Sequence, residues 1–126
     1  MSPVVNMLFK GESVTKNIEN DWMTPAQLNA IQSLYLGGHN FEDPLASPVF
    51  AHLRGLPRLY VQAGTHELLL SDIASFVDKA RWAGVPVRFE LWEGMFHSWQ
   101  AFADKVPEGE QAINLVGAFI RDALAR

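Results

Sequence analysis

The chain of 126 residues contains no cysteine. A disulfide framework, a thiol nucleophile and a cysteine metal site are therefore excluded. Basic residues are also few, because 10 lysines and arginines stand against 14 aspartates and glutamates, for a formal net charge of −4. Without a basic run the chain has no electrostatic surface for nucleic acid, and we expect no such partner.

Long hydrophobic runs are missing as well. Charged side chains interrupt the first part of the chain, and no apolar run approaches the roughly 20 residues that a membrane-spanning helix requires. Nothing resembles a signal peptide, so we expect a cytoplasmic protein without a membrane span. The acidic residues show no metal-ligand spacing, which argues against a metal site.

What the chain does contain is a core. Apolar residues make up 48% and charged residues 19% of the sequence, a balance typical of a globular domain. A doubly wound sheet usually needs a longer chain, so we interpret residues 1–126 as one partial domain. Entry loops and a helix occupy residues 1–57, and a strand-helix-strand-helix unit occupies residues 58–126.

The clearest pattern is a strand, a helix and a second strand. The apolar runs at Leu59–Ala63 and Val87–Trp92 are typical of parallel strands covered on both faces. Between them, an amphipathic segment that starts near Ser71 and ends at Gly84 predicts a helix.

Other helices are indicated by their ends. Thr24 and the following proline predict a capped helix that stops at Gly37, and Pro107 opens a final helix that reaches Ala125. A short apolar patch from Trp99 suggests one further helical turn. Residues 1–20 show no lasting period and are expected to be extended and rich in loops.

Two loops carry candidate chemistry. Glu67 follows the first strand and His97 follows the second, and the carboxyl ends of parallel strands meet at one edge of a sheet. A carboxylate and a histidine are two parts of a Ser-His-acid triad, which in one known chain order begins with the nucleophile. The nucleophile motif Gly-x-Ser-x-Gly is absent, since Gly11-Glu-Ser13-Val-Thr15 lacks the second glycine.

Alternatives remain open for each of these residues. Glu67 could instead be a charge that stabilises a helix N-terminus. Asp72 competes with it as the triad acid, although it looks placed to begin the following helix. Trp99, next to the histidine loop, could line a substrate pocket.

Several short motifs combine along the chain. They are Ser2-Pro3, Leu36-Gly37-Gly38, Asp43-Pro44-Leu45-Ala46, Ser47-Pro48, Gly55-Leu56-Pro57, the run from Gln62 to Asp72, Gly84-Val85-Pro86-Val87 and the run from Trp92 to His97. Together they resemble the C-terminal part of the hormone-sensitive-lipase-like esterases, the α/β-hydrolase fold-3 group. The resemblance covers nearly the whole chain.

This resemblance implies the C-terminal portion of an α/β-hydrolase fold, an α/β architecture here without its nucleophile-bearing half. Such enzymes hydrolyse small carboxylic esters, acyl esters or lactones, through an acyl-enzyme intermediate and without metal or cofactor. It assigns the catalytic histidine to His97 and the acid to Glu67. Many members have Asp-Pro-Leu where this chain has Glu67-Leu68-Leu69.

Two functions are then expected. The first is a carboxylesterase domain to which this chain contributes the acid and the histidine, and which is inactive alone because the nucleophilic serine is not in it. The second is a non-catalytic truncated remnant that binds a partner or self-associates, because the strands would expose an edge. Either a homo-oligomer or a complex with a missing N-terminal half should form, and side chains such as Val61 and Leu91 should be partly exposed.

Overall fold

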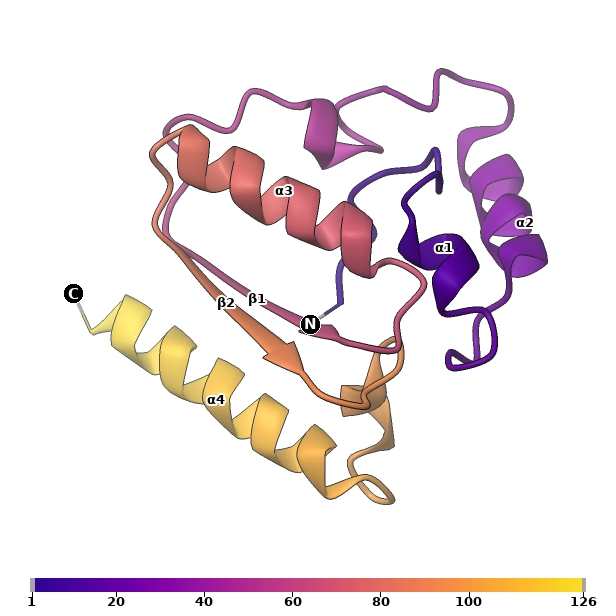
Figure 1. The fold of residues 1–126 in the computed structure, drawn as a ribbon. Coiled ribbons are helices and arrows are strands. Elements are labelled where there is room, and N and C mark those ends of the chain that lie inside the picture. Colours follow the sequence, from indigo (N-terminus) through magenta and orange to yellow (C-terminus); the bar gives the residue numbers. More distant parts are fainter. Residues whose placement is uncertain (1, 126) are drawn as a thin grey trace.

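Two parallel strands organise the computed structural model, which describes residues 2–125 (Figure 1). Strand β1 (Leu59–Gly64) pairs with β2 (Val87–Trp92), so that Leu59 lies opposite Val87 and Gly64 lies opposite Trp92. Helix α3 (Leu70–Trp82) connects them, beginning one residue before the predicted start. The predicted parallel strand-helix-strand unit is confirmed, and the loops after both strands leave the same edge of the sheet.

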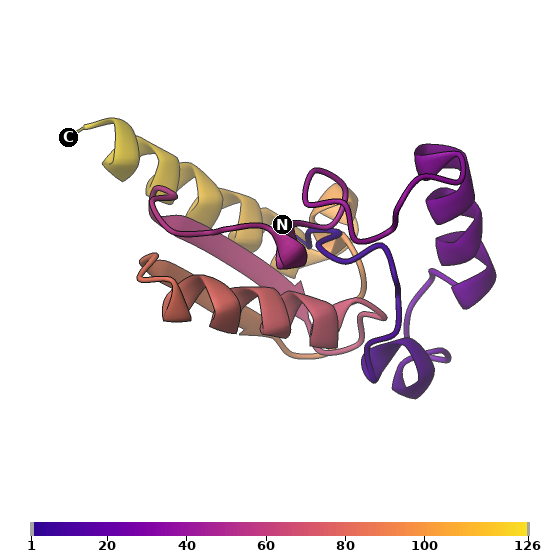
Figure 2. The ribbon, with the colours of Figure 1, turned by 90° about the horizontal axis from the view of Figure 1, so that it is seen from above.

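The two faces of the sheet are covered differently. Figure 1 and Figure 2 show α3 on one face and α4 (Pro107–Leu124) on the other. The α3 face is the apolar core, built from Val61 and Ala63 of the first strand and from the inner side of α3. Val61 is only 6% exposed, so its predicted exposure is wrong because α3 covers it, whereas Leu91 is 54% exposed as expected.

The sheet face toward α4 carries more polar side chains. Alternate residues of a strand point to opposite sides, so Tyr60 and Gln62 of β1 both face α4. Gln62 Nε2 donates to the main-chain oxygen of Ala112 at 3.0 Å. The ring of Tyr60 lies 5.3 Å from that of Phe119, between centroids. This helix therefore rests on the sheet through polar and aromatic contacts.

The entry segment wraps the end of this unit. It contains α1 (Ser13–Lys16), α2 (Pro25–Leu36) and the 3₁₀ turn η1 (Pro48–Phe50). Figure 2 shows α1 and α2 lying beyond the end of the sheet. The capping box at Thr24 is present. Helix α1 was not predicted, because four residues are too few to show a helical period.

Residues 2–9 form no helix or strand and contain a turn at Met7 and Leu8, in keeping with the predicted loop-rich segment, and several of their side chains are buried. Val5, Met7 and Phe9 are 4%, 7% and 7% exposed and join the same core as α3. After β2 the predicted helical turn is found as the 3₁₀ helix η2 (Trp99–Phe102). None of the helices in residues 2–125 combines the length and the apolar character needed to cross a membrane.

Candidate active site

The acid loop, residues 65–69, begins where β1 ends. Glu67 has a fully buried side chain, at 0% exposure. Its Oε1 accepts hydrogen bonds from Ser2 Oγ and from the main-chain N–H of Gly64, both at 2.6 Å. These two donors fix the plane of the carboxylate, and they leave its second oxygen, Oε2, available to another partner.

The histidine loop, residues 93–98, follows β2 and lies directly against the acid loop. Gly94 turns the chain with φ 71°, a conformation that glycine adopts at little cost. A β-carbon on Gly64 would lie only 2.0 Å from the main-chain oxygen of Met95. That same oxygen accepts from the N–H of His66 at 3.0 Å. The absence of a side chain at Gly64 is therefore what allows the two loops to touch.

Their contact brings the predicted pair together. His97 Nδ1 lies 3.2 Å from Glu67 Oε2, and the two side chains are 13% and 0% exposed. With the Nδ1 hydrogen directed at the carboxylate, Nε2 carries the lone pair and can accept a proton. The arrangement can therefore act as an oriented general base.

A hydroxyl group lies at the second ring nitrogen. Ser98 Oγ is 3.2 Å from His97 Nε2, and the N–H of Ser98 reaches Ser2 Oγ at 3.4 Å. Ser98 has φ 55°, a left-handed conformation that costs a non-glycine residue roughly 1–3 kcal/mol and is common at functional sites. The sequence pattern did not single out Ser98, although its position directly after His97 was a usable signal.

Asp72, the alternative acid, lies in a different place. It is in the first turn of α3 and 6% exposed, and its Oδ1 accepts from Asn6 Nδ2 at 2.8 Å. Burial raises the pKa of its carboxyl group, and the hydrogen bond from Asn6 partly opposes that rise. Across residues 2–125, no hydrogen bond or ion pair joins Asp72 to His97, so Glu67 is the carboxylate that meets the histidine.

Trp99, the expected pocket residue, is a core residue in this structure. Its side chain is 0% exposed, and its ring packs 5.7 Å from that of Trp92, between centroids. The exposed indole beside the histidine is that of Trp22, which is 54% exposed with its ring centroid 6.2 Å from the imidazole. Trp22 rather than Trp99 is therefore available to a molecule at His97.

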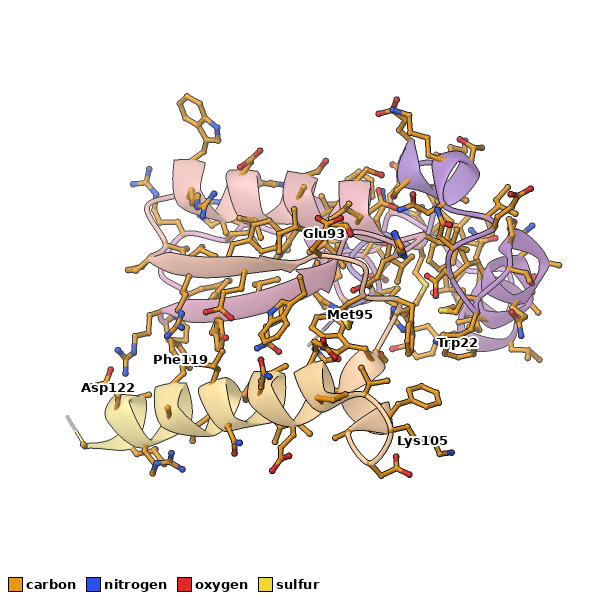
Figure 3. All side chains as sticks on the ribbon, turned by 60° about the horizontal axis from the view of Figure 1, so that its bottom comes forward. Trp22, Glu93, Met95, Lys105, Phe119 and Asp122 are labelled. Carbon is orange, nitrogen blue, oxygen red and sulfur yellow. The ribbon has the colours of Figure 1, made fainter. Side chains whose placement is uncertain are left out.

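A groove lies at the opposite end of the sheet. It has a volume of about 720 Å³ and includes Arg58, Arg88 and Phe119 in its lining. Both guanidinium groups are paired, Arg58 with Asp122 and Arg88 with Glu90. Figure 3 shows Phe119 and Asp122 at one end of the sheet and Met95 and Trp22 at the other. The groove is thus separate from the Glu67–His97 pair.

Within the part of the chain that the structure describes, no group of three or more histidine, cysteine, aspartate or glutamate side chains could hold an ion.

Comparison with known proteins gives the arrangement a context. A family profile described as the α/β hydrolase fold matches residues 1–101. An acetyl-hydrolase of Streptomyces hygroscopicus is 38% identical over 124 residues, which are 98% of this chain and 42% of that protein. An esterase of Acinetobacter venetianus is 35% identical over 94% of this chain and 40% of its own length.

Solved structures of esterases are also similar to this chain. An esterase from the bacterial hormone-sensitive lipase family superposes with a TM-score of 0.89 at 44% identity, over 94% of this chain and 40% of that one. An esterase/lipase from an uncultured bacterium gives a TM-score of 0.89 at 39% identity, over 98% and 42%. The chain thus spans about two fifths of the length of the relatives it matches.

Proposed function

Because this chain belongs to the α/β-hydrolase fold family, we propose that it supplies the acid and the general base of a carboxylic ester hydrolase. The observation that carries the proposal is the 3.2 Å contact between His97 Nδ1 and a fully buried Glu67. Glu67 would orient the imidazole, and His97 would take the proton of an attacking serine hydroxyl and later return it to the leaving alcohol. The names of the relatives support ester substrates.

The nucleophile of this proposal lies outside the 126 residues. No Gly-x-Ser-x-Gly motif occurs in them, and the matched relatives are more than twice as long as the matched region. Oxyanion donors, which often contribute the largest electrostatic stabilisation in acyl transfer, would likewise come from outside these 126 residues. We therefore expect the isolated chain to hydrolyse p-nitrophenyl acetate no faster than its His97→Ala variant.

A chimera tests the proposal directly. The 126 residues would replace the matching segment of the acetyl-hydrolase relative, which supplies its own preceding sequence. We expect hydrolysis of p-nitrophenyl acetate, with kcat lowered about a thousandfold or more by His97→Ala and about a hundredfold or more by Glu67→Gln. Asp72→Asn, the matched control, should leave kcat within a few-fold because that carboxyl group does not meet His97.

The outcomes separate clearly. A chimera that melts cooperatively yet shows no His97-dependent turnover would contradict the proposal. Loss of activity in Asp72→Asn but not in Glu67→Gln would transfer the acid role to Asp72. Turnover by the isolated chain that vanishes with His97→Ala would show that another hydroxyl, such as that of Ser98, or a water has been recruited as the nucleophile.

A second function is favoured by a different observation. Among the described residues each strand pairs with a single neighbour, and Leu91 of β2 is 54% exposed. Open strand edges can pair with another chain. The chain alone would then be a self-associating module without catalysis, and its sedimentation as a dimer or larger species would support this function.

A further inference from the structure

Residues 17–22, which we call the brace loop, connect α1 to α2 and lie against both the acid loop and the histidine loop. Asn17 makes the first contact. Its Nδ2 donates to the main-chain oxygen of Thr65 at 3.0 Å and to that of Glu67 at 2.8 Å. The brace loop therefore fixes the main chain of the acid loop on both sides of His66.

Asp21 joins the two loops with one carboxylate. Its Oδ2 accepts from the N–H of Leu68 at 2.9 Å, and its Oδ1 accepts from the N–H of His97 at 3.1 Å. Leu68 directly follows Glu67 in the chain. The Asp21 side chain thus links the main chain at His97 to the main chain at Leu68, the residue after Glu67.

Trp22 holds the other main-chain polar group of His97. Its Nε1–H donates to the main-chain oxygen of His97 at 2.8 Å, although the indole as a whole is 54% exposed. Figure 3 shows Trp22 at the end of the sheet where Met95 and the histidine loop lie. Both polar main-chain groups of His97 therefore end on two consecutive residues of the brace loop, one an acceptor and the other a donor.

These contacts bear on the geometry of the pair. The histidine loop has neither a helix nor a strand ladder to hold the main chain at His97. The Nδ1–Oε2 separation of 3.2 Å is at the long end of the hydrogen-bonding range, so a small shift of either loop would break it. A charged acceptor gives the stronger kind of hydrogen bond, and Asp21 makes two of them across the gap between the loops.

We propose that Asp21 and Trp22 are positioning residues that set the separation of Glu67 and His97. Neither touches the imidazole nitrogens, and both act through the main chain of His97. Asp21 sets the distance between the two loops, and Trp22 fixes the orientation of the His97–Ser98 peptide. The catalytic meaning of this role rests on the proposed function, whereas the geometric role does not.

Nuclear magnetic resonance on the full chain tests the geometric role without any turnover. Two signals report on it: hydrogen exchange at the amides of Leu68 and His97, and the proton shared by His97 Nδ1 and Glu67. In Asp21→Ala we expect exchange at both amides to accelerate about tenfold or more, and the shared-proton signal to be lost. Amides of the core, such as that of Ile73, should keep their protection.

Conservative variants sharpen the result. Asp21→Asn retains one acceptor oxygen, so one of the two amides should recover protection and the shared-proton signal should return in part. Trp22→Phe removes the indole N–H and keeps a smaller aromatic ring, and it should weaken the shared-proton signal while the Leu68 amide stays protected. Two exposed controls should change neither signal: Trp82→Phe, from a side chain that is 91% exposed, and Asp78→Ala, from one that is 68% exposed.

An unchanged shared-proton signal in Asp21→Ala would overturn the proposal. If that variant does not fold, Trp22→Phe decides, and an unchanged signal there overturns the proposal equally. Uniform loss of protection, including that of Ile73, would show general destabilisation and would also count against a positioning role. A chimera without activity but with these signals intact would reject the esterase function and leave the brace loop assignment standing.

Discussion

Asp72 carries a carboxyl group that is 6% exposed, and its Oδ2 is buried without a hydrogen-bond partner among residues 2–125. Burial raises its pKa above the ordinary value of 3.8, so the folded protein holds this proton more tightly than the unfolded chain. The stability that protonation contributes is therefore complete below that ordinary value and is lost as pH rises through the folded-state pKa.

Asp72→Asn should remove this dependence. An amide keeps an oxygen that can accept from Asn6 and carries no charge, so we expect the variant to melt at a higher temperature than the parent chain at pH 7. Thermal unfolding followed between pH 3 and pH 7 measures the effect, with the exposed Asp78→Asn as control. A variant that is less stable than the parent at pH 7 would show that the ionised carboxylate is favoured in the fold.

Single residues were predictable where their position alone carried the signal. Glu67 and His97 follow strands, and this placement suggested that they meet. The burial of Asp72 could not be predicted, because its partner Asn6 is 66 positions away in the chain. The support that Ser2 gives to Glu67 depends equally on a distant contact, which no local pattern encodes.

At the scale of elements, the end of β1 packs against the histidine loop with main-chain atoms in direct contact. Gly64→Ala would place a β-carbon 2.0 Å from the main-chain oxygen and 2.5 Å from the carbonyl carbon of Met95. Both are backbone atoms, so the loops must separate. We expect a loss of stability of roughly 1–3 kcal/mol or more, together with loss of the Glu67–His97 contact.

Gly117→Ala gives the matched control in α4. There the new β-carbon would meet only the flexible end of Arg121, at 3.4 Å, and alanine favours a helix over glycine by about 0.5–1 kcal/mol. Denaturant unfolding should therefore show opposite signs for the two substitutions. Similar stability of Gly64→Ala and the parent chain would mean that the loops are not held in this contact.

Helices and strands with a sustained pattern of apolar residues, or with a recognisable capping residue at one end, were predicted correctly. The two strands, α3 and α4 follow from apolar periodicity, and α2 follows from its capping box and the glycines after it. Helix α1 escaped prediction because its four residues are placed by tertiary contacts, such as that of Ser13 Oγ with the main-chain oxygen of Leu68 at 2.6 Å.

For the whole molecule, exposed apolar side chains predict association. Several large ones are more than half exposed, namely Trp22, Leu34, Tyr35, Leu45, Trp82, Leu91 and Leu124. Among the described residues each strand also has an open edge, and an open edge can pair with another chain. We expect the purified chain to sediment as a dimer or larger species at micromolar concentration.

Paired variants locate the interface. Leu91→Lys places a charge on the open strand β2 and should shift sedimentation toward the monomer, whereas Leu45→Lys, in the entry segment at 92% exposure, should not. Equal effects would place the contact away from the strand edge. A compact monomer with one sharp thermal transition would contradict the association and show that residues 1–126 are stable alone.

The supports of the Glu67–His97 pair have a consequence for the smallest peptide that could hold it. Ser2 reaches Glu67 over 65 positions, and Asp21 and Trp22 reach His97 over 76 and 75. A fragment limited to residues 59–98 would contain both ionisable groups and lack all three of these partners. The shortest continuous piece that includes the pair with these three partners runs from Ser2 to His97, and α4 lies wholly beyond it.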